Sequence, residues 1–564
     1  MSGTSRASRI LVLASMAAAV SIALRPLLSR DHVPVFRDLL LYIVPIKHFL
    51  AEHLRRGEIP LWNPWISLGA PFLAAMHPGV FYPPTALLLL PWPAGLNVFL
   101  LAHYLIGLLG MWTFLGARGV GSAGAAVGGL TFALGGYMIS LLNIPKELQG
   151  VAWLPWALFF WQRWLSRSSP RDLALTAMMV ALQILGGAVE SLLMTATLLA
   201  FFSLQAEAPS ARALIRAAGG LAIVILGAGA LTAFQLLPTL EYAMQSGRAG
   251  ALSESQVFHW SLQPISLLQL VLPISAAADA GLPSVGSGLE PYPPLFESVY
   301  LGVPALCLAF AGVIGGREQR FWGLVLVVAL MLAAGSSTPL LPLLYQAAPG
   351  LFGRFRYPEK FLLLFHVSAA VLAAYGLAKL ETGRHQALSA AIVVASLLCV
   401  IAAGVWLFVR YDPQAYLTLI SRVGGRSPTA VVAVAETLVL QAGRLFVLAA
   451  AFVAVLTLAR RALIGNRVAC LLLVVLEAGD LLTIRWRTLI TTSWPEILAT
   501  TPLVNVDELR EHHQRVFHYG DVPADASNPA GFRLEQWTIP ADDLISQYRV
   551  AWATLFGNAG MSYG

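Results

Sequence analysis

The chain has 564 residues and is 57% hydrophobic but only 12% charged, with a formal net charge of +7 at pH 7. An ordinary soluble domain is about 25% charged, so this composition excludes a water-soluble globular protein and predicts a surface covered largely by lipid. The positive charge does not indicate nucleic-acid binding, because many of the basic residues lie in short loops between apolar runs and no Lys/Arg-rich stretch with interleaved aromatics occurs.

Thirteen apolar runs follow one another along the chain. A helix that crosses the hydrocarbon core of a bilayer needs about 20 apolar residues. The runs approach that length and predict an all-α polytopic membrane protein with about 13 transmembrane helices, at 10–28, 96–115, 122–142, 148–163, 173–189, 191–206, 217–238, 298–315, 321–338, 361–379, 387–409, 430–458 and 468–484. The apolar stretch 80–92 contains several prolines, which favour a re-entrant or interfacial piece.

The charges between these runs predict the topology. With the N-terminus in the cytoplasm, every predicted cytoplasmic loop carries Lys or Arg, as the positive-inside rule requires. The longer segments then lie outside, and they hold most of the acids and prolines: 29–95, 239–297, 339–360 and 485–564. We therefore expect a transmembrane domain over 1–484 with amphipathic outer loops, a short extracytoplasmic segment over 485–564, and chemistry on the outer face.

The first outer loop, 29–95, places an acid directly after the first predicted helix. Asp38 would lie where the apolar membrane meets water, and partial burial raises a carboxyl pKa toward the range of a general base. Other residues of this loop are candidates for contacts with a lipid-linked substrate: Tyr42 and Trp62 in an aromatic shelf at headgroup level, with Asn63 and His77. The alternative is a simple interfacial loop in which Asp38 only solvates the helix entrance.

A later outer loop carries three cations beside aromatic residues, in the sequence Phe352-Gly-Arg354-Phe355-Arg356-Tyr357-Pro358-Glu359-Lys360. Arginine offers a planar fork for phosphate oxygens and lysine a point charge, so the loop suits a phosphate or pyrophosphate. The alternative is a collar of cations that snorkel at a helix end.

The long outer loop 239–297 adds acids at helix ends. Glu241 and Glu297 would bind a sugar hydroxyl or a metal ion, or pair with Arg248. Solvation of a helix end is the simpler explanation for each acid alone, and it applies equally to Lys146, Glu147 and Glu190.

Three further features bear on the interpretation of the sequence. The chain has no P-loop, which argues against an ATP-driven pump. The Gly-rich stretch 121–136 is predicted to be an apolar helix with small packing residues. Arg444 lies in the middle of a predicted helix, and the sequence offers no reason for it.

Several outer-loop motifs, taken in order, resemble the YfhO-like bacterial membrane proteins, which are similar to the GT-C superfamily of polytopic glycosyltransferases. The motifs are Asp38 with Tyr42-x-x-Pro45, Gly57-Glu58-Ile-Pro60-Leu-Trp62-Asn63-Pro64, Gly69-Ala-Pro71, Phe81-Tyr82-Pro83-Pro84, Ala152-Trp153-Leu154-Pro155-Trp156, Gln235-Leu-Leu-Pro238, Glu297 with Tyr300-x-Gly302, and Phe355-Arg356-Tyr357-Pro358-Glu359-Lys360. The resemblance covers essentially 29–484.

The resemblance implies an enzyme of the bacterial cytoplasmic membrane that transfers a sugar from a polyprenyl-phosphate donor to a cell-envelope acceptor on the outer face. Asp38 would act on the acceptor hydroxyl, while Arg356 and Lys360, with Arg248 in reserve, would stabilise the departing phosphate. No metal site is predicted, and the need for a divalent cation stays open. A flippase for lipid-linked saccharides and a non-catalytic assembly subunit are the alternatives.

Overall fold

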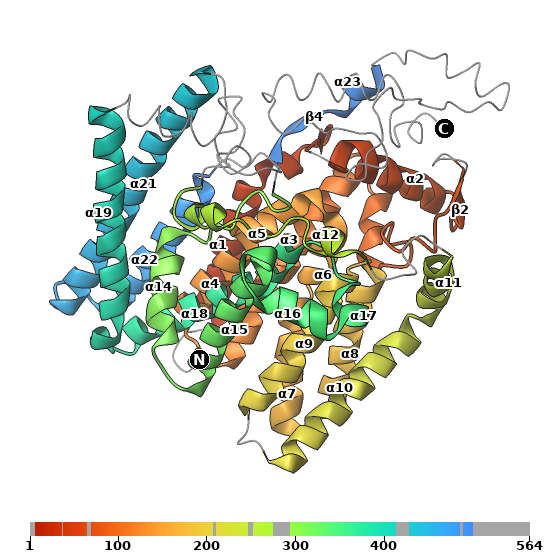
Figure 1. The fold of residues 1–564 in the computed structure, drawn as a ribbon, viewed down its shortest axis with the longest axis horizontal. Helices are drawn as coiled ribbons and strands as arrows, with labels where there is room; N and C mark the ends of the chain where they lie inside the picture. Colours follow the sequence, from red (N-terminus) through yellow and green to blue (C-terminus); the bar gives the residue numbers. More distant parts are fainter. Residues whose placement is uncertain are drawn as a thin grey trace.

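The computed structural model of the chain describes residues 6–36, 38–64, 69–206, 210–245, 252–273, 294–412, 428–484 and 489–499. Arg37 and Arg248 lie outside the described residues. The described part is mostly helical, which confirms the all-α prediction (Figure 1). The helices of its first half are α1 Arg6–Ala23, α2 Val44–Arg55, α3 Ala94–Ala117, α4 Ser122–Leu134, α5 Gly136–Ser140, α6 Pro145–Val151, α7 Leu154–Arg167, α8 Pro170–Leu185, α9 Val189–Ala206, α10 Ala211–Leu231 and α11 Ala233–Met244.

The second half continues in the same way. Its helices are α12 Glu254–Val257, α14 Val303–Val313, α15 Arg317–Ala333, α16 Leu340–Ala347, α17 Pro349–Phe352, α18 Leu362–Glu381, α19 Ser389–Tyr411, α21 Pro428–Arg460, α22 Asn466–Leu482 and α23 Trp494–Ala499. Short strands form two antiparallel pairs, β1 His32–Pro34 with β4 Thr491–Ser493, and β2 Trp62–Asn63 with β3 Ala70–Pro71. The β1–β4 pair fastens the start of the predicted C-terminal outer segment to the first outer loop.

Six helical stretches of the described residues are long and apolar enough to cross a membrane. They are Ala94–Ala117, Ser122–Asn143, Ala211–Leu231, Pro358–Glu381, Ser389–Tyr411 and Leu438–Arg460. Three shorter apolar helices accompany them, Arg9–Ala23, Val189–Leu204 and Val303–Val313. The chain is therefore a helical membrane protein by length and composition of its helices, while the count of 13 crossings stays a prediction.

The core is built around α18, which is buried along nearly its whole length. Glycines let neighbouring helices approach it closely. A Cβ at Gly312 would meet the Leu372 carbonyl oxygen at 2.0 Å, and a Cβ at Gly128 of α4 would meet the Ala370 carbonyl oxygen at 2.9 Å. Small residues at such contacts allow tight packing in lipid, where the hydrophobic effect does not drive helices together. The prediction of a packing helix in the Gly-rich stretch 121–136 is confirmed over Ser122–Leu134, while Gly135 is extended.

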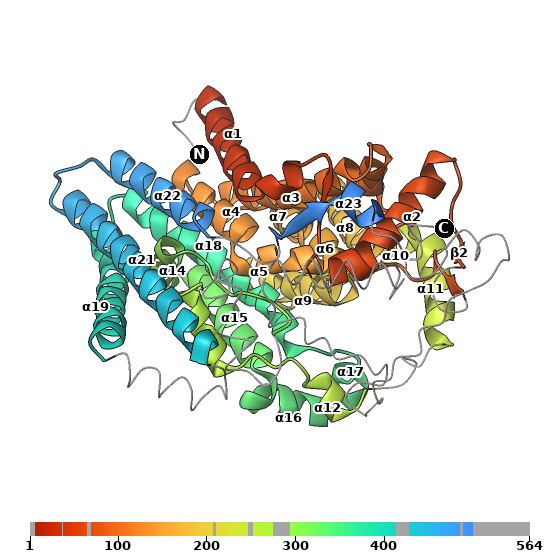
Figure 2. The same ribbon diagram turned by 90° about the horizontal axis from the view of Figure 1, so that it is seen from above.

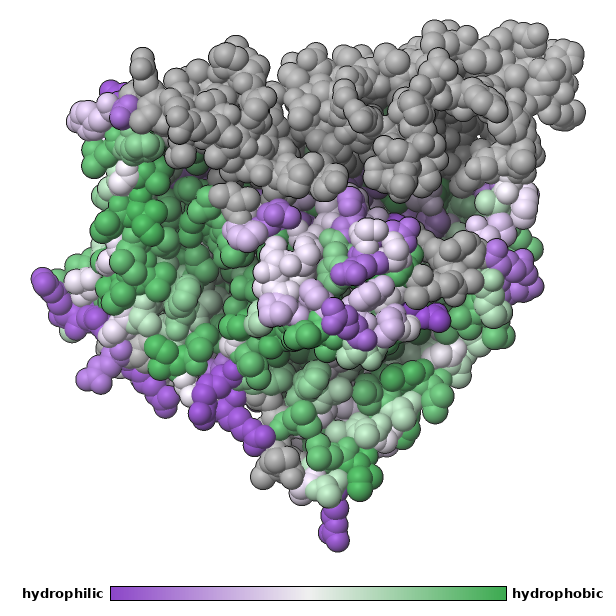
Figure 3. All heavy atoms as spheres, viewed as in Figure 1, coloured by the Kyte–Doolittle hydropathy of each residue, from purple (hydrophilic) through white to green (hydrophobic). Residues whose placement is uncertain are grey.

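Two groups of helices form the flanks of the molecule. Figures 1 and 2 show α19 and α21 on one side and α10 and α11 on the other. Their outward faces are apolar and exposed: Leu226 of α10 is 72% exposed and Val400 of α19 is 70% exposed. Figure 3 shows a broad hydrophobic band with hydrophilic residues along its lower margin. Such a band suits the hydrocarbon core of a bilayer.

Ion pairs join the ends of helices, both neighbouring and distant in the sequence. Arg118 pairs with Glu318, and Arg163 pairs with Asp172 at 3.1 Å. Strict alternation of the helices puts all four residues on one side, the predicted cytoplasmic one. Their contacts agree with that alternation, while the orientation of the protein in its membrane stays a prediction.

The predicted helix 298–315 is wrong in its first turns. Residues 294–302 are buried but not helical, and α14 begins only at Val303. Two acids of α22 cap this late start: Asp480 Oδ2 accepts from the Val303 amide at 2.7 Å, and Glu477 Oε2 accepts from the Ala305 amide at 3.0 Å. Carboxylates stabilise a helix N-terminus because its first amides have no partner within the helix.

This cap explains Arg444. Its guanidinium donates to the carboxylate of Asp480 and also to the Asp480 carbonyl oxygen at 2.6 Å. The Tyr300 hydroxyl donates to the same carboxylate at 2.8 Å. Asp480 is 1% exposed, so without these donors its charge would lie uncompensated among the helices. Arg444 therefore holds α21 to α22 and to the start of α14.

Candidate functional site

A cavity of about 430 Å³ opens between α6, α9, the turn at 75–77 and the loop that follows α17. Its lining combines apolar and charged side chains, from Ala75, Met76, His77, Lys146, Gly187, Val189, Glu190, Leu193, Arg354 and Phe355. All its charged members, and His77, come from connections on the predicted outer side. The cavity thus gathers residues that are up to 280 positions apart in the chain.

Two lysines and two glutamates form an ionic cluster at this cavity. Glu190 Oε1 lies 2.5 Å from Lys360 Nζ, and Glu190 Oε2 lies 4.0 Å from Lys146 Nζ. Glu147 lies deeper, with its Oε1 at 3.8 Å from Lys360 and 3.9 Å from Lys146. The hydroxyl of Ser191 donates to Glu147 Oε2 at 2.5 Å. Burial, and then the neighbouring Glu190 carboxylate, raise the pKa of Glu147 above its ordinary value, against the opposing effect of both lysines.

Local sequence explains how the cluster forms. Pro145 starts α6 and puts Glu147 in its first turn, and α9 starts at Val189 with Glu190 in its first turn. Acids are favoured there by the partial positive charge of a helix N-terminus. Between α8 and α9, Gly187 has φ +79°, and a Cβ at this position would meet the His77 Cα at 3.2 Å. Glycine therefore lets the α8–α9 turn close against the 75–77 turn.

Hydrogen-bonded groups connect the cavity wall to Tyr42, which lies one turn after the predicted base. The Nδ1 of His77 lies 2.9 Å from the Ala75 carbonyl oxygen. A carbonyl only accepts, so Nδ1 carries the proton and Nε2 accepts from the Tyr42 hydroxyl, with which it is in contact. Asp38 is exposed and lies one turn before Tyr42, where its charge adds to the effect of burial and raises the pKa of Tyr42 to about 12.

His77 is neutral at pH 7. Burial lowers its pKa to about 4, and the charges of Lys146 and Lys47 add to this, while the bond to Ala75 opposes it. A neutral ring with its Nε2 occupied by Tyr42 is suited to fixing the cavity wall. It is not set up to exchange protons with a ligand near neutral pH.

Lys47 lies behind this wall and is 1% exposed. Its ammonium group donates to the Pro78 carbonyl oxygen at 2.8 Å and lies 4.7 Å from the centre of the Phe99 ring. Burial lowers the pKa of Lys47 to about 7. The lysine thus fastens α2 to the turn that carries His77. Burial of its amine costs solvation free energy, which this contact only partly offsets.

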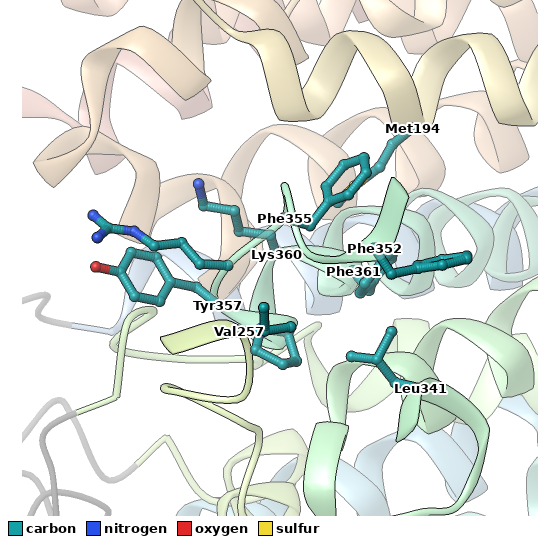
Figure 4. A pocket seen from close by; sticks show the side chains of 10 residues that line it. Met194, Val257, Leu341, Phe352, Phe355, Tyr357, Lys360 and Phe361 are labelled. Carbon is teal, nitrogen blue, oxygen red and sulfur yellow. The ribbon is translucent and has the colours of Figure 1, made fainter. Parts of the chain in front are cut away.

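The cationic loop predicted to bind phosphate divides between two pockets. Arg354 and Phe355 line the cavity, whereas Arg356 and Lys360 line a small adjoining pocket together with Phe355. In Figure 4, Phe355 points toward Met194 of α9, and the Lys360 side chain extends away from Leu341. The Arg356 guanidinium lies 4.3 Å from the centre of the Tyr357 ring. Lys360 also belongs to the ionic cluster beside the cavity, so one loop contributes to both pockets.

Four further residues that the sequence predicts as substrate contacts do not line the cavity. Trp62 is 53% exposed and packs its ring over Gly69, while its neighbour Asn63 is fully buried. Glu241 is exposed on α11, and Glu297 is buried in the extended segment before α14. None of these four is among the residues that line the cavity, and neither is Asp38.

Sequence reasoning gave too little weight to Lys146, Glu147 and Glu190, because each one alone is explained by solvation of a helix end. A signal was nevertheless present. These residues and the cationic loop fall in connections of the same predicted side, so their charges had to meet there or be solvated. Only the three-dimensional packing shows that they meet.

Among the described residues, no group of three or more His, Cys, Asp or Glu side chains is placed to hold a metal ion. In comparisons with known proteins, no family profile and no curated protein matches the chain. The fold and the cavity define a helical membrane protein with a charged, partly apolar cavity between its helix ends.

Proposed function

We propose that the chain is a membrane glycosyltransferase that takes a sugar from a polyprenyl-phosphate donor and transfers it to a cell-envelope acceptor. The supporting observation is the cavity itself: it lies near the ends of apolar helices, is lined by both apolar and charged side chains, and is reached by the cationic loop. A ligand with a polar head and an apolar chain fits such a lining.

We also propose that the chain is YfhO-like, resembles the GT-C enzymes in fold, and lies in the bacterial cytoplasmic membrane with its N-terminus inside. In the proposed reaction, an acceptor hydroxyl attacks the anomeric carbon of the sugar. The new carbon–oxygen bond forms as the bond to the phosphate oxygen breaks, and the hydroxyl proton passes to the Asp38 carboxylate. The negative charge that develops on the departing phosphate is stabilised by Arg356 and Lys360.

The test supplies the purified protein, in lipid nanodiscs, with a polyprenyl-phosphate sugar and candidate acceptors. Asp38→Asn should reduce transfer by about 10²–10⁴-fold, which is the typical contribution of a general base. Glu58→Gln is the matched control, because Glu58 is an exposed acid of the same loop, and it should leave transfer unchanged. Absence of transfer by the wild type with every donor, or an unaffected rate in Asp38→Asn, would remove this proposal.

One observation favours a second function, the transport of a lipid-linked saccharide. Glu477 and Asp480 are buried among helices at the late start of α14, and broken elements with ionisable groups are common at ion-coupled transport sites. Movement of a fluorescent lipid-linked sugar across proteoliposomes distinguishes the two. Lipid movement that is lost in Glu477→Gln but retained in Asp38→Asn supports the transporter. Sugar transfer that is lost in Asp38→Asn but retained in Glu477→Gln supports the enzyme.

A further inference from the structure

The two lysines of the ionic cluster differ in how closely their acidic neighbours approach them. Lys360 is 9% exposed and makes a close pair with Glu190 at 2.5 Å. Lys146 is 34% exposed, and its two acidic neighbours are no closer than 3.9 and 4.0 Å. An ammonium group at those distances from carboxylates has donors to spare for a closer partner.

Arg354 stands at the same cavity with most of its guanidinium unused by the described residues. Its Nε donates to the Gly350 carbonyl oxygen at 3.2 Å, and the side chain is exposed. Two cations from different segments, Lys146 of α6 and Arg354 of the loop after α17, therefore line one cavity with donors available to a ligand.

The formal charges of the cavity are balanced except for one. Lys146 and Lys360 are offset by Glu147 and Glu190, and Arg354 adds a positive charge. Glu190 is the acid of the cluster that lines the cavity, whereas Glu147 is 2% exposed and does not. An anion that enters would meet the Glu190 carboxylate beside the cation it needs.

We propose that Glu190 is a resident counter-ion for Lys146, and that a phosphate ester enters the cavity by taking its place between Lys146 and Arg354. Lys360 stays paired with Glu190 during this exchange and keeps that carboxylate aside. Binding is then weakened by an acid of the protein, which keeps the site from holding its anion permanently. This inference rests on the proposed function and on the same cavity, but it places the phosphate on Lys146 and Arg354 in place of Arg356 and Lys360, and it names Glu190 as the competitor.

The proposal makes an unusual demand: removal of one charge from the site should tighten binding. The full chain, purified in a neutral detergent, is titrated with inorganic phosphate by calorimetry. Glu190→Gln should bind phosphate about tenfold more tightly than the wild type, because a like charge near the bound anion is removed. Lys146→Gln and Arg354→Gln should each bind it several-fold more weakly, and the exposed-acid control Glu58→Gln should match the wild type.

Unchanged or weaker phosphate binding in a folded Glu190→Gln variant would overturn the proposal. If Glu190→Gln does not fold, the other two variants decide: unchanged binding in both Lys146→Gln and Arg354→Gln would overturn it. Competition identifies the source of the phosphate. Displacement by phosphatidic acid in nanodiscs indicates a lipid headgroup, displacement by soluble glycerol phosphate indicates a free ester, and displacement by neither overturns the proposal.

These titrations need no turnover. The predicted binding pattern without any sugar transfer would remove the proposed function and leave the anion site standing. Transfer without the binding pattern would do the opposite.

Discussion

Two ionic clusters among the described residues differ in what surrounds them. Around Asp480, every charged or polar group meets a partner that helps to hold three helices together: Arg444, the Tyr300 hydroxyl and the first amide of α14. Around Glu190, one cation is loosely held, and the cluster opens onto a cavity of about 430 Å³. The first arrangement joins helices to one another, whereas the second has both spare donors and a cavity beside them.

This difference teaches that buried charge alone does not mark a functional site in a membrane protein. Intramembrane ions are costly, so they are a reason to look for function. At Asp480 the cost is offset by a structural task, the late start of α14. At the cavity, Lys146 has no comparable task, which is why the function is proposed there. The three predictions below test the comparison, beginning with the largest effect.

Removing Arg444 should damage the structure more than any change at the cavity. Arg444→Met leaves the Asp480 carboxylate without its cation, and breaking a buried pair from one side costs about 3–5 kcal/mol. Thermal unfolding in detergent should show a large fall in midpoint. The double variant with Asp480→Asn should recover part of it, because no buried charge is then left alone. An unchanged midpoint in Arg444→Met would show that the cluster is not structural.

Lys47 should make stability depend on pH above neutrality. Its pKa is about 7 in the folded protein against 10.5 for an ordinary lysine. Between these values the unfolded chain binds the extra proton, so stability should rise from pH 7 to pH 10 by about 1 kcal/mol per pH unit. Lys47→Met should flatten this slope in unfolding measurements, while Lys146→Met should keep it. Equal slopes in the wild type and Lys47→Met would contradict the assignment.

The Tyr42–His77 contact should have the smallest effect on stability and a visible effect on activity. Tyr42→Phe removes the hydroxyl that donates to His77 Nε2, for a loss of about 1 kcal/mol. Sugar transfer should fall because His77 is no longer fixed in the cavity wall. Tyr411→Phe on the exposed face of α19 is the control for both measurements. Transfer at the wild-type rate in Tyr42→Phe would show that the Tyr42–His77 contact does not contribute to sugar transfer.

Apolar length and proline placement were sufficient to predict the helical membrane fold. Helix α3 and the buried α18 fall on predicted runs, and the proline-rich stretch 80–92 contains a 3₁₀ helix at Pro83–Leu89 instead of an α-helix. The late start of α14 could not be predicted, because the acids that cap it are about 175 residues away. Judged by apolar composition alone, residues 298–302 are predicted to be helical.

The candidate site was predictable only in part. Residue chemistry pointed to the cationic loop, and His77 and Lys360 were named as substrate contacts. The partners of Lys360 were not foreseen, since Glu147 and Glu190 come from two other segments and each has an ordinary local explanation. A pairing between distant loops depends on how helices pack, and no local pattern records it.

Photo-crosslinking tests the central claim, that the cavity binds the lipid phosphate, most directly. A benzophenone amino acid is placed either at Leu193, which lines the cavity, or at Leu226 on the exposed face of α10, and a labelled polyprenyl phosphate is added. The label should attach at both positions, and phosphatidic acid in excess should suppress attachment at Leu193 more strongly than at Leu226. Equal attachment at both positions, insensitive to the competitor, would contradict a phosphate site in this cavity.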